Sequence, residues 1–145
     1  MARILVVEDD PDTRMMFGKL VDIAGHDIAF ATNGWEALLL LENDSIELIL
    51  LDLMMPGMDG GTFLKILRNG SRHKDIPVVV ITAMDAGDIA KKTEHFAVVA
   101  ILQKNAGLID RLVEIIGQTL SPPIKRRADS EITESLSDGE SPYKN

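Results

Sequence analysis

The chain has 145 residues, of which 46% are hydrophobic, and a formal net charge of −8, so it suits one domain with an appendage and is too short for two ordinary domains. The negative charge argues against broad nucleic-acid binding, because affinity for a phosphate backbone comes from lysine and arginine. No apolar run approaches the roughly 20 residues that span a bilayer, and the absence of cysteine excludes thiol chemistry and disulfides, so we expect a cytoplasmic protein that does not enter a membrane.

Apolar runs of strand length alternate with segments of helical period along most of the chain. Strands are predicted at residues 4–7, 27–31, 47–51, 77–81 and 98–102. Four of these runs are nearly continuous in Val, Ile, Leu or Ala, as expected of strands that are covered on both faces. The run at 27–31 is weaker, which favours a place at the edge of the sheet.

The segments between the strands have the spacing of amphipathic helices. Helices are predicted at residues 11–24, 35–41, 61–68, 88–96 and 108–120. Strands that alternate with helices are typical of βαβ units. We therefore predict an α/β, flavodoxin-like doubly wound (βα)5 fold with a five-stranded parallel sheet in the order 2-1-3-4-5, which binds ligands outside the carboxyl ends of its strands.

The composition changes after Leu120. Two prolines follow at once, and residues 124–145 are rich in Ser, Asp and Glu with no apolar period. Such a segment cannot bury enough apolar surface to fold. We expect a globular domain at residues 1–120 and a disordered C-terminal tail at residues 121–145.

Polar residues follow the predicted strands at the edge where this fold binds ligands. Glu8 and Asp9 follow the first strand, Asp52 the third and Thr82 the fourth, and the fifth runs out into Lys104. Because parallel strands bring their carboxyl ends to one edge, these side chains are expected to be neighbours.

A cluster of carboxylates at a buried edge is costly unless a cation compensates it. Mg²⁺ prefers a few carboxylate oxygens, retained water and a phosphate oxygen. Glu8, Asp9 and Asp52 therefore predict a magnesium site. The alternative is that Glu8 and Asp9 are solvated acids.

Asp52 is placed to act as a nucleophile toward phosphorus, since carboxylates form aspartyl phosphates. The phosphoryl oxygens then need partners besides the metal. Lys104 and the Thr82 hydroxyl, helped by the backbone N–H of Ala83, can supply them.

The run Leu-Asp-Leu-Met-Met-Pro-Gly-Met-Asp-Gly at residues 51–60 is similar to the phosphoacceptor strand and turn of bacterial response regulators. Together with the acidic pair Glu8-Asp9, the Thr82-Ala83 pair and Lys104, it makes residues 2–120 resemble a receiver domain. The resemblance implies a single-domain, Mg²⁺-dependent regulator that accepts a phosphoryl group on Asp52 from a histidine kinase or phosphotransfer protein. It also implies that the backbone carbonyl of Met54 is a metal ligand.

The output implied by the resemblance is a shape change on the face of the fourth helix, fifth strand and fifth helix. That face would contact a downstream protein or a second copy of the chain as a homodimer. The chain would not be an enzyme in the ordinary sense, since it would catalyse only its own phosphorylation and dephosphorylation.

The chain departs from the family pattern at several positions. Asn105 replaces the usual proline after the lysine; since a cis bond before a non-proline residue costs about 2.5–4 kcal/mol, either the bond is trans and Lys104 is directed differently, or packing holds the strain. Ile101 replaces the usual aromatic switch residue and cannot swing as a ring does. In the family, the positions two after the phosphoacceptor and two after the threonine influence how water reaches the acyl phosphate. Here they are Met54 and Met84, whose bulky and apolar side chains predict a slowly hydrolysing phosphoryl form.

Three functions remain open from the residues alone. A stand-alone phosphorylated receiver is favoured. An aspartate-based phosphatase of the haloacid dehalogenase type would need a second acid where Met54 stands. A degenerate receiver that binds partners without phosphorylation is supported only by Asn105 and Ile101. The apolar run at residues 95–101 either packs in the core or adds to the output surface.

Overall fold

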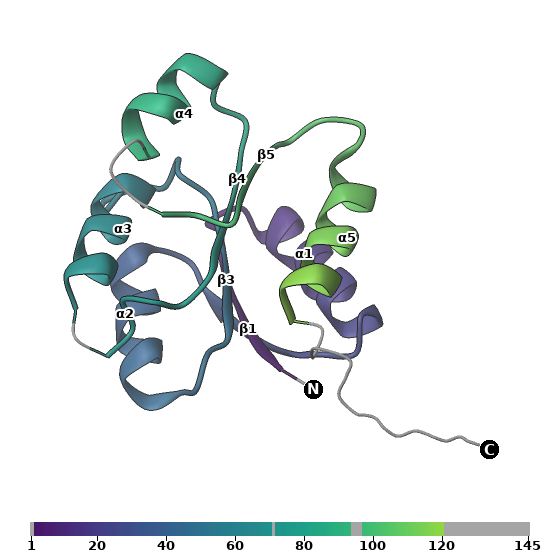
Figure 1. Cartoon of the computed structure of the whole chain (residues 1–145), viewed down its shortest axis with the longest axis horizontal. Helices are drawn as coiled ribbons and strands as arrows, with labels where there is room; N and C mark the ends of the chain where they lie inside the picture. Colours follow the sequence, from purple (N-terminus) through teal and green to yellow (C-terminus); the bar gives the residue numbers. More distant parts are fainter. Residues whose placement is uncertain (1, 71, 94–96, 121–145) are drawn as a thin grey trace, which may run out of the picture.

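A computed structural model describes residues 2–70, 72–93 and 97–120 of the chain, in which strands and helices alternate (Figure 1). The elements are β1 (Arg3–Val7), α1 (Pro11–Ile23), β2 (Asp27–Ala31), α2 (Gly34–Asn43), β3 (Leu48–Leu51), α3 (Gly60–Asn69), β4 (Val78–Thr82), α4 (Ala86–Thr93), β5 (Ala100–Gln103) and α5 (Leu108–Leu120). The strands form one parallel sheet in the order β2-β1-β3-β4-β5. The predicted fold and strand order are confirmed, and the predicted tail lies outside the described residues.

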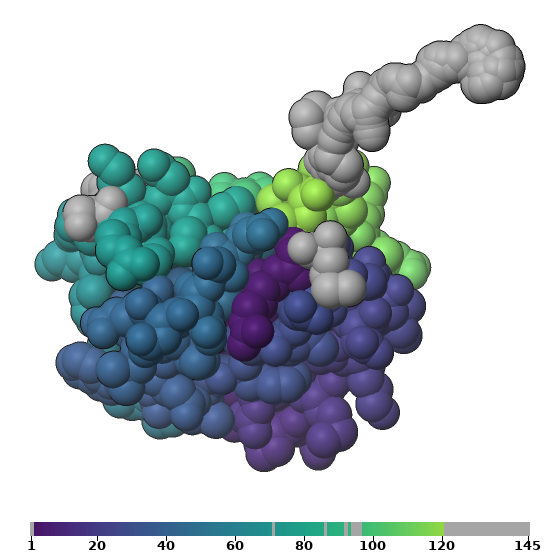
Figure 2. Space-filling model, turned by 90° about the horizontal axis from the view of Figure 1, so that it is seen from below, coloured from purple at the N-terminus to yellow at the C-terminus, as the bar shows by residue number. Residues whose placement is uncertain are grey.

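The sheet is covered on both faces, by α1 and α5 on one side and by α2, α3 and α4 on the other (Figure 1). Turned by 90°, the start of β1, in dark purple, lies in the middle of the molecule between blue segments on one side and indigo segments on the other (Figure 2). No helix of the described ranges is both long and apolar enough to cross a membrane.

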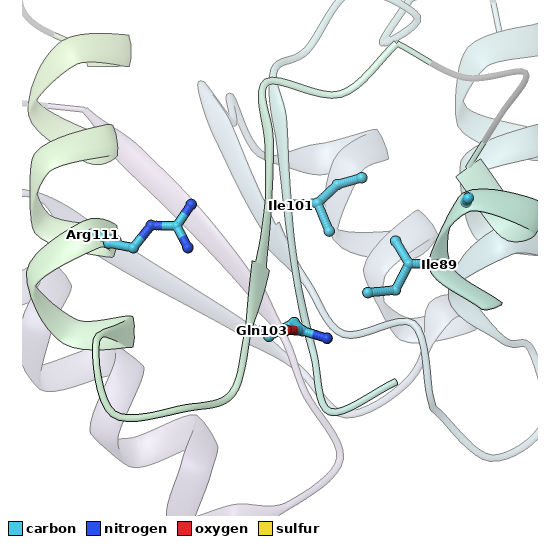
Figure 3. A pocket seen from close by; sticks show the side chains of 5 residues that line it. Ile89, Ile101, Gln103 and Arg111 are labelled. Atoms are coloured by element: carbon cyan, nitrogen blue, oxygen red, sulfur yellow. The ribbon is translucent and has the colours of Figure 1, made fainter. Parts of the chain in front are cut away.

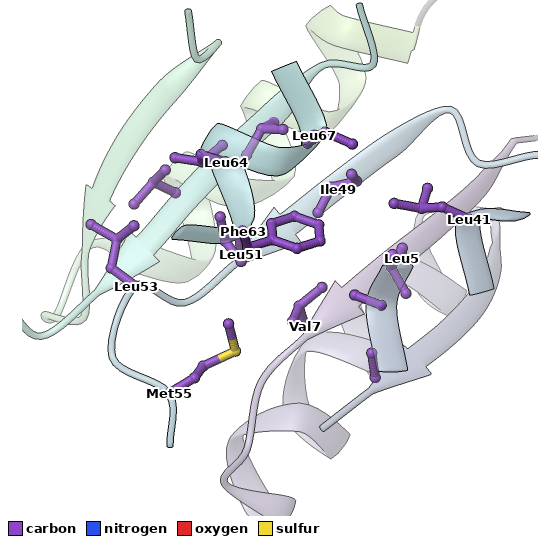
Figure 4. Close-up of a cluster of buried hydrophobic side chains, with 14 of the residues drawn as sticks. Leu5, Val7, Leu41, Ile49, Leu51, Leu53, Met55, Phe63, Leu64 and Leu67 are labelled. Atoms are coloured by element: carbon purple, nitrogen blue, oxygen red, sulfur yellow. The ribbon is translucent and has the colours of Figure 1, made fainter. Parts of the chain in front are cut away.

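Two apolar cores fill the space between the sheet and its helices. Because side chains alternate along a strand, β1 sends Leu5 and Val7 into the core on the α2 and α3 side (Figure 4). It sends Ile4 and Val6 into the other core, which α1 and α5 cover. The inner strands are therefore apolar at nearly every position, as their sequences predict; the exceptions are Arg3 at the start of β1 and Thr82 at the end of β4.

The two edge strands differ from the inner ones. β2 lies at one edge, as its weaker pattern predicts. β5 forms the other edge, and the prediction that its run is covered on both faces is wrong. Leu102 is buried, whereas Val99 just before β5 and Ile101 within it are 48% and 37% exposed. α4 does not fully cover the face of β5 on which Ile101 lies. Val99 and Ile101, which belong to the apolar run at 95–101, therefore add to the surface. Residues 95 and 96 of this run lie outside the described ranges.

Element boundaries agree with the sequence to within about two residues, with two informative differences. α4 begins at Ala86 instead of residue 88, and the end predicted at residue 96 lies outside the described residues. α2 runs to Asn43, and Trp35 in its first turn is 64% exposed. Trp35 therefore contributes little to the packing of this helix.

Candidate functional site

The acidic residues meet where β1 and β3 end. These strands are in register with Val7 beside Leu51, and the Asp52 N–H donates to the Val7 carbonyl at 3.1 Å. The residues that follow each strand, Glu8 and Asp52, are therefore neighbours, and both are almost fully buried. The hydrophobic strands β1 and β3 thus hold two carboxyl groups at a position where water alone cannot solvate them.

Asp9 completes a group of three carboxylates with Glu8 and Asp52. One carboxylate oxygen from each of these residues lies within 4.8 Å of the other two, and Asp9 is exposed to solvent. Oxygen ligands with one open side suit Mg²⁺, which retains water and takes a substrate oxygen. The residues present therefore fit the predicted magnesium site.

Asp52 is also held by the loop that follows it. Its Oδ1 accepts a hydrogen bond from the Met54 N–H at 3.1 Å, while the Met54 side chain is 55% exposed. Gly60, at the start of α3, packs against the backbone of this loop, where a Cβ would lie 2.6 Å from Leu53 Cα. The loop can adopt this path only because position 60 has no side chain.

Lys104 reaches the carboxylates from the end of β5. Its Nζ lies 2.9 Å from Glu8 Oε1 and 3.3 Å from Asp52 Oδ2. Burial raises the pKa of Glu8, and the hydrogen bond from Lys104 opposes this only in part. Burial also disfavours the Lys104 ammonium, but the hydrogen bond to Glu8 and the charge of Asp52 outweigh it and raise the pKa of Lys104. The Lys104 side chain thus stays positively charged between the two acids. Asn105 follows it in the chain.

Thr82 ends β4 next to this group. Its side chain is fully buried, and its hydroxyl accepts a hydrogen bond from the Met84 N–H at 3.2 Å. Its carbonyl accepts from the Lys104 N–H at 2.9 Å, which joins the two segments. Ala83 follows Thr82 in the loop between β4 and α4 and is exposed. The contacts within the described residues bring Glu8, Asp52 and Lys104 together directly, with Thr82 attached through the backbone.

Arg14 also contributes to the site, although the sequence does not point to it. Its Nη1 donates to the carbonyls of Glu8 and Asp9, at 3.0 and 3.4 Å. It therefore fixes the acidic loop from the first turns of α1, which Asp10 caps through the Thr13 N–H at 2.9 Å. The one available signal was its position six residues after Glu8, on a helix with a proline at its start.

The family model of the response regulator receiver domain matches residues 4–116. Among curated proteins, the chain is 38% identical over 96 residues to the DNA-binding dual master transcriptional regulator RpaA of Synechocystis sp., covering 66% of this chain and 39% of that protein. It is 31% identical over 85 residues to the protein PilH of Pseudomonas aeruginosa, covering 59% and 70%. The match spans 39% or less of the first relatives, which include the response regulator PleD of Caulobacter vibrioides at 18%.

Solved structures have the same fold. The chemotaxis protein CheY4 of Vibrio cholerae superposes with a TM-score of 0.75 at 26% identity, covering 83% of this chain and 99% of that one. The response regulator Rcp1, whose structure is of a Mn²⁺-bound form, superposes with a TM-score of 0.71 at 25% identity, covering 84% and 97%.

Proposed function

The chain belongs to the response regulator receiver domain family, and on that premise we propose that it is a phosphoacceptor switch modified on Asp52. A histidine kinase or phosphotransfer protein would supply the phosphoryl group. A bond forms between an Asp52 carboxylate oxygen and phosphorus while the bond from phosphorus to the donor breaks. The chain acts on no other substrate in this proposal and hydrolyses only its own acyl phosphate.

One observation carries the proposal: a single ammonium group contacts two nearly buried carboxylates. Lys104 Nζ lies within hydrogen-bond distance of both Glu8 and Asp52. The lysine can therefore stabilise Asp52 before the reaction and a phosphoryl oxygen on Asp52 after it. The Thr82 hydroxyl at the end of β4 and the Ala83 N–H that follows it are proposed to bind the remaining phosphoryl oxygens.

We assign the magnesium ion to carboxylate oxygens of Glu8, Asp9 and Asp52, with the Met54 carbonyl as a further ligand. The proximity of the three acids and the Mn²⁺-bound form of the similar regulator Rcp1 support this assignment. A bound cation would neutralise charge that develops on the phosphoryl oxygens. Glu8 and Arg14 keep the acidic loop in place around it.

The proposed output is a shape change on the face formed by α4, β5 and α5, read by a downstream protein in the cytoplasm or by a second copy of the chain. The phosphoryl group can shift the equilibrium only if it binds one arrangement of Thr82 and Lys104 better than the other. Thr82 and Lys104 both belong to segments that border this face, which supports placing the output there.

Phosphorylation by acetyl phosphate tests the proposal. The full chain is incubated with acetyl phosphate, with and without Mg²⁺, and its intact mass is measured. We expect a Mg²⁺-dependent gain of one phosphoryl group in the wild type and in Asp110→Asn, a matched change of an exposed aspartate on α5. Asp52→Asn should gain none.

A chain that takes up no phosphoryl group under any of these conditions would contradict the proposal. It would instead favour a receiver that binds its partner without phosphorylation. Modification of Asp52→Asn to the same extent as the wild type would show that the acceptor is a different residue.

A further inference from the structure

The side chain of Gln103 joins the loop beside the site to the open face of β5. Its Nε2 donates to the Met84 carbonyl at 3.2 Å. Gln103 is the last residue of β5 and is paired with Thr82, so its amide extends the contact between the two segments beyond the end of the sheet. This side chain is exposed to solvent.

Met84 is held at both of its backbone polar groups. Its N–H donates to the Thr82 hydroxyl, and its carbonyl accepts from Gln103. The hydroxyl that we assign to a phosphoryl oxygen and the amide on β5 are therefore linked through one residue. A Thr82 side chain that turns toward Asp52 must break the bond to the Met84 N–H or take Met84 with it.

Gln103 also lines a surface pocket of about 290 Å³ together with Ile89, Ala90, Ile101 and Arg111. Figure 3 shows these side chains around the opening between α4, β5 and α5, with the Gln103 amide at its lower end. Among the described residues of this pocket, Gln103 is the one whose side chain bonds to the loop between β4 and α4. Ile101 has no polar atom in its side chain and cannot do so.

We propose that Gln103 is a positioning residue that holds Met84, and with it the Thr82 loop, in the unphosphorylated arrangement. Its release on phosphorylation would free the loop and change the polar rim of the pocket on the α4, β5 and α5 face. This inference rests on the proposed function and names the side chain that connects the phosphorylation site with the output face. The Gln103 amide would couple the Thr82 loop to this face, which the apolar side chain of Ile101 cannot do.

The hydrogen bond from Gln103 should favour the unphosphorylated arrangement over the phosphorylated one by a measurable factor. A neutral hydrogen bond of ordinary net strength corresponds to about a two- to tenfold change in an equilibrium. A variant without the amide should therefore bind a phosphoryl analogue about two- to tenfold more tightly than the wild type, because it no longer has to break this bond.

The experiment uses the full chain, Mg²⁺ and beryllium fluoride as the phosphoryl analogue. Affinity is measured by titration for the wild type, Gln103→Met, Gln103→Glu and the control Gln118→Met, which makes the same change at an exposed position on α5. In parallel, NMR follows the side-chain NH₂ signals of Gln103 in the wild type, which report its hydrogen bond directly and do not depend on how a variant folds.

We expect both Gln103 variants to bind more tightly and Gln118→Met to match the wild type. The Gln103 NH₂ signals should shift on binding. Equal affinity in all four proteins, or NH₂ signals that do not move while the wild type binds the analogue, would overturn the role of Gln103 and leave the proposed function intact. Failure of the wild type itself to bind the analogue would overturn the proposed function, and the inference with it.

Discussion

Lys104 Nζ lies 2.9 Å from Glu8 Oε1, although the two residues are 96 positions apart in the sequence. Glu8 is almost entirely buried, whereas a quarter of the Lys104 side chain is exposed. The lysine therefore compensates a carboxylate that water does not reach, and it does so next to the proposed phosphoacceptor. The same contact contributes to stability and to the chemistry of the site.

Replacement of Lys104 by methionine should destabilise the fold by about 1–3 kcal/mol at pH 8 in metal-free buffer, because it leaves the buried Glu8 carboxylate without its donor. The loss should be smaller at pH 5. Burial already raises the pKa of Glu8, and a carboxyl group with a raised pKa binds its proton more readily in the folded state. Protonation of Glu8 therefore favours folding at low pH. This contribution to stability is lost as the pH rises through the pKa that Glu8 has in the folded state.

Urea denaturation at both pH values measures this effect. Lys65→Met, at an exposed position on α3, is the matched control and should change stability little at either pH. A Lys104→Met loss of equal size at pH 5 and pH 8 would show that the contact with Glu8 is not its cause.

Mg²⁺ should stabilise the wild-type chain against thermal unfolding. A ligand that binds only the folded state contributes about 2.7 kcal/mol at one hundred times its dissociation constant. Asp9→Asn removes one charged ligand of the proposed site and should lose much of this gain. Asp12→Asn, an exposed acid on α1, should keep it. If Asp9→Asn retains the full Mg²⁺-dependent shift in Tm, the three-carboxylate group is not the binding site.

The phosphoryl form should be hydrolysed slowly, because neither Met54 nor Met84 offers a group that can orient water. The Met54 side chain is 55% exposed, and Met84 packs partly against the core, so position 54 is the better one to change. Met54→Asn should accelerate loss of the phosphoryl group on the order of tenfold or more, since a polar group placed near an attacking water aids proton transfer.

The decay of the phosphorylated mass after removal of acetyl phosphate measures this rate. Met15→Asn makes the same change at another exposed methionine, which is 62% exposed, and should leave the rate unchanged. A wild-type half-life of seconds would refute the idea.

Gly60→Ala should destabilise the protein by about 1–3 kcal/mol. Its Cβ would lie 2.6 Å from Leu53 Cα and 3.0 Å from the Asp52 carbonyl oxygen, and backbone cannot move aside as a flexible side chain can. Gly117→Ala on α5 should instead be neutral or stabilising by about 0.5–1 kcal/mol, since no atom outside its chain neighbours and the backbone of its own helix lies within 4 Å of its Cβ position. Thermal unfolding of both variants gives the comparison. Equal stability of the two would mean that the loop after Asp52 adjusts freely.

The sequence alone predicts the alternation of strands and helices and the edge at which the acids meet. Both depend on local patterns: apolar runs, helical spacing and the position of a charge directly after a strand. The strand order then follows from the fold class that the alternation indicates. The sequence also placed β2 at an edge from its weaker apolar character. It was wrong for β5, because an apolar run alone does not reveal which neighbour fails to cover it.

The directions of individual side chains follow from the packing of the folded chain. Lys104 contacts both Glu8 and Asp52, Arg14 fixes the acidic loop, and Gln103 reaches Met84. The residues in these contacts come from different elements, and each geometry depends on how β5, α1 and their loops pack against the sheet. A local pattern carries no information on such distances, since side-chain directions are set by the packing of segments that are remote in the chain.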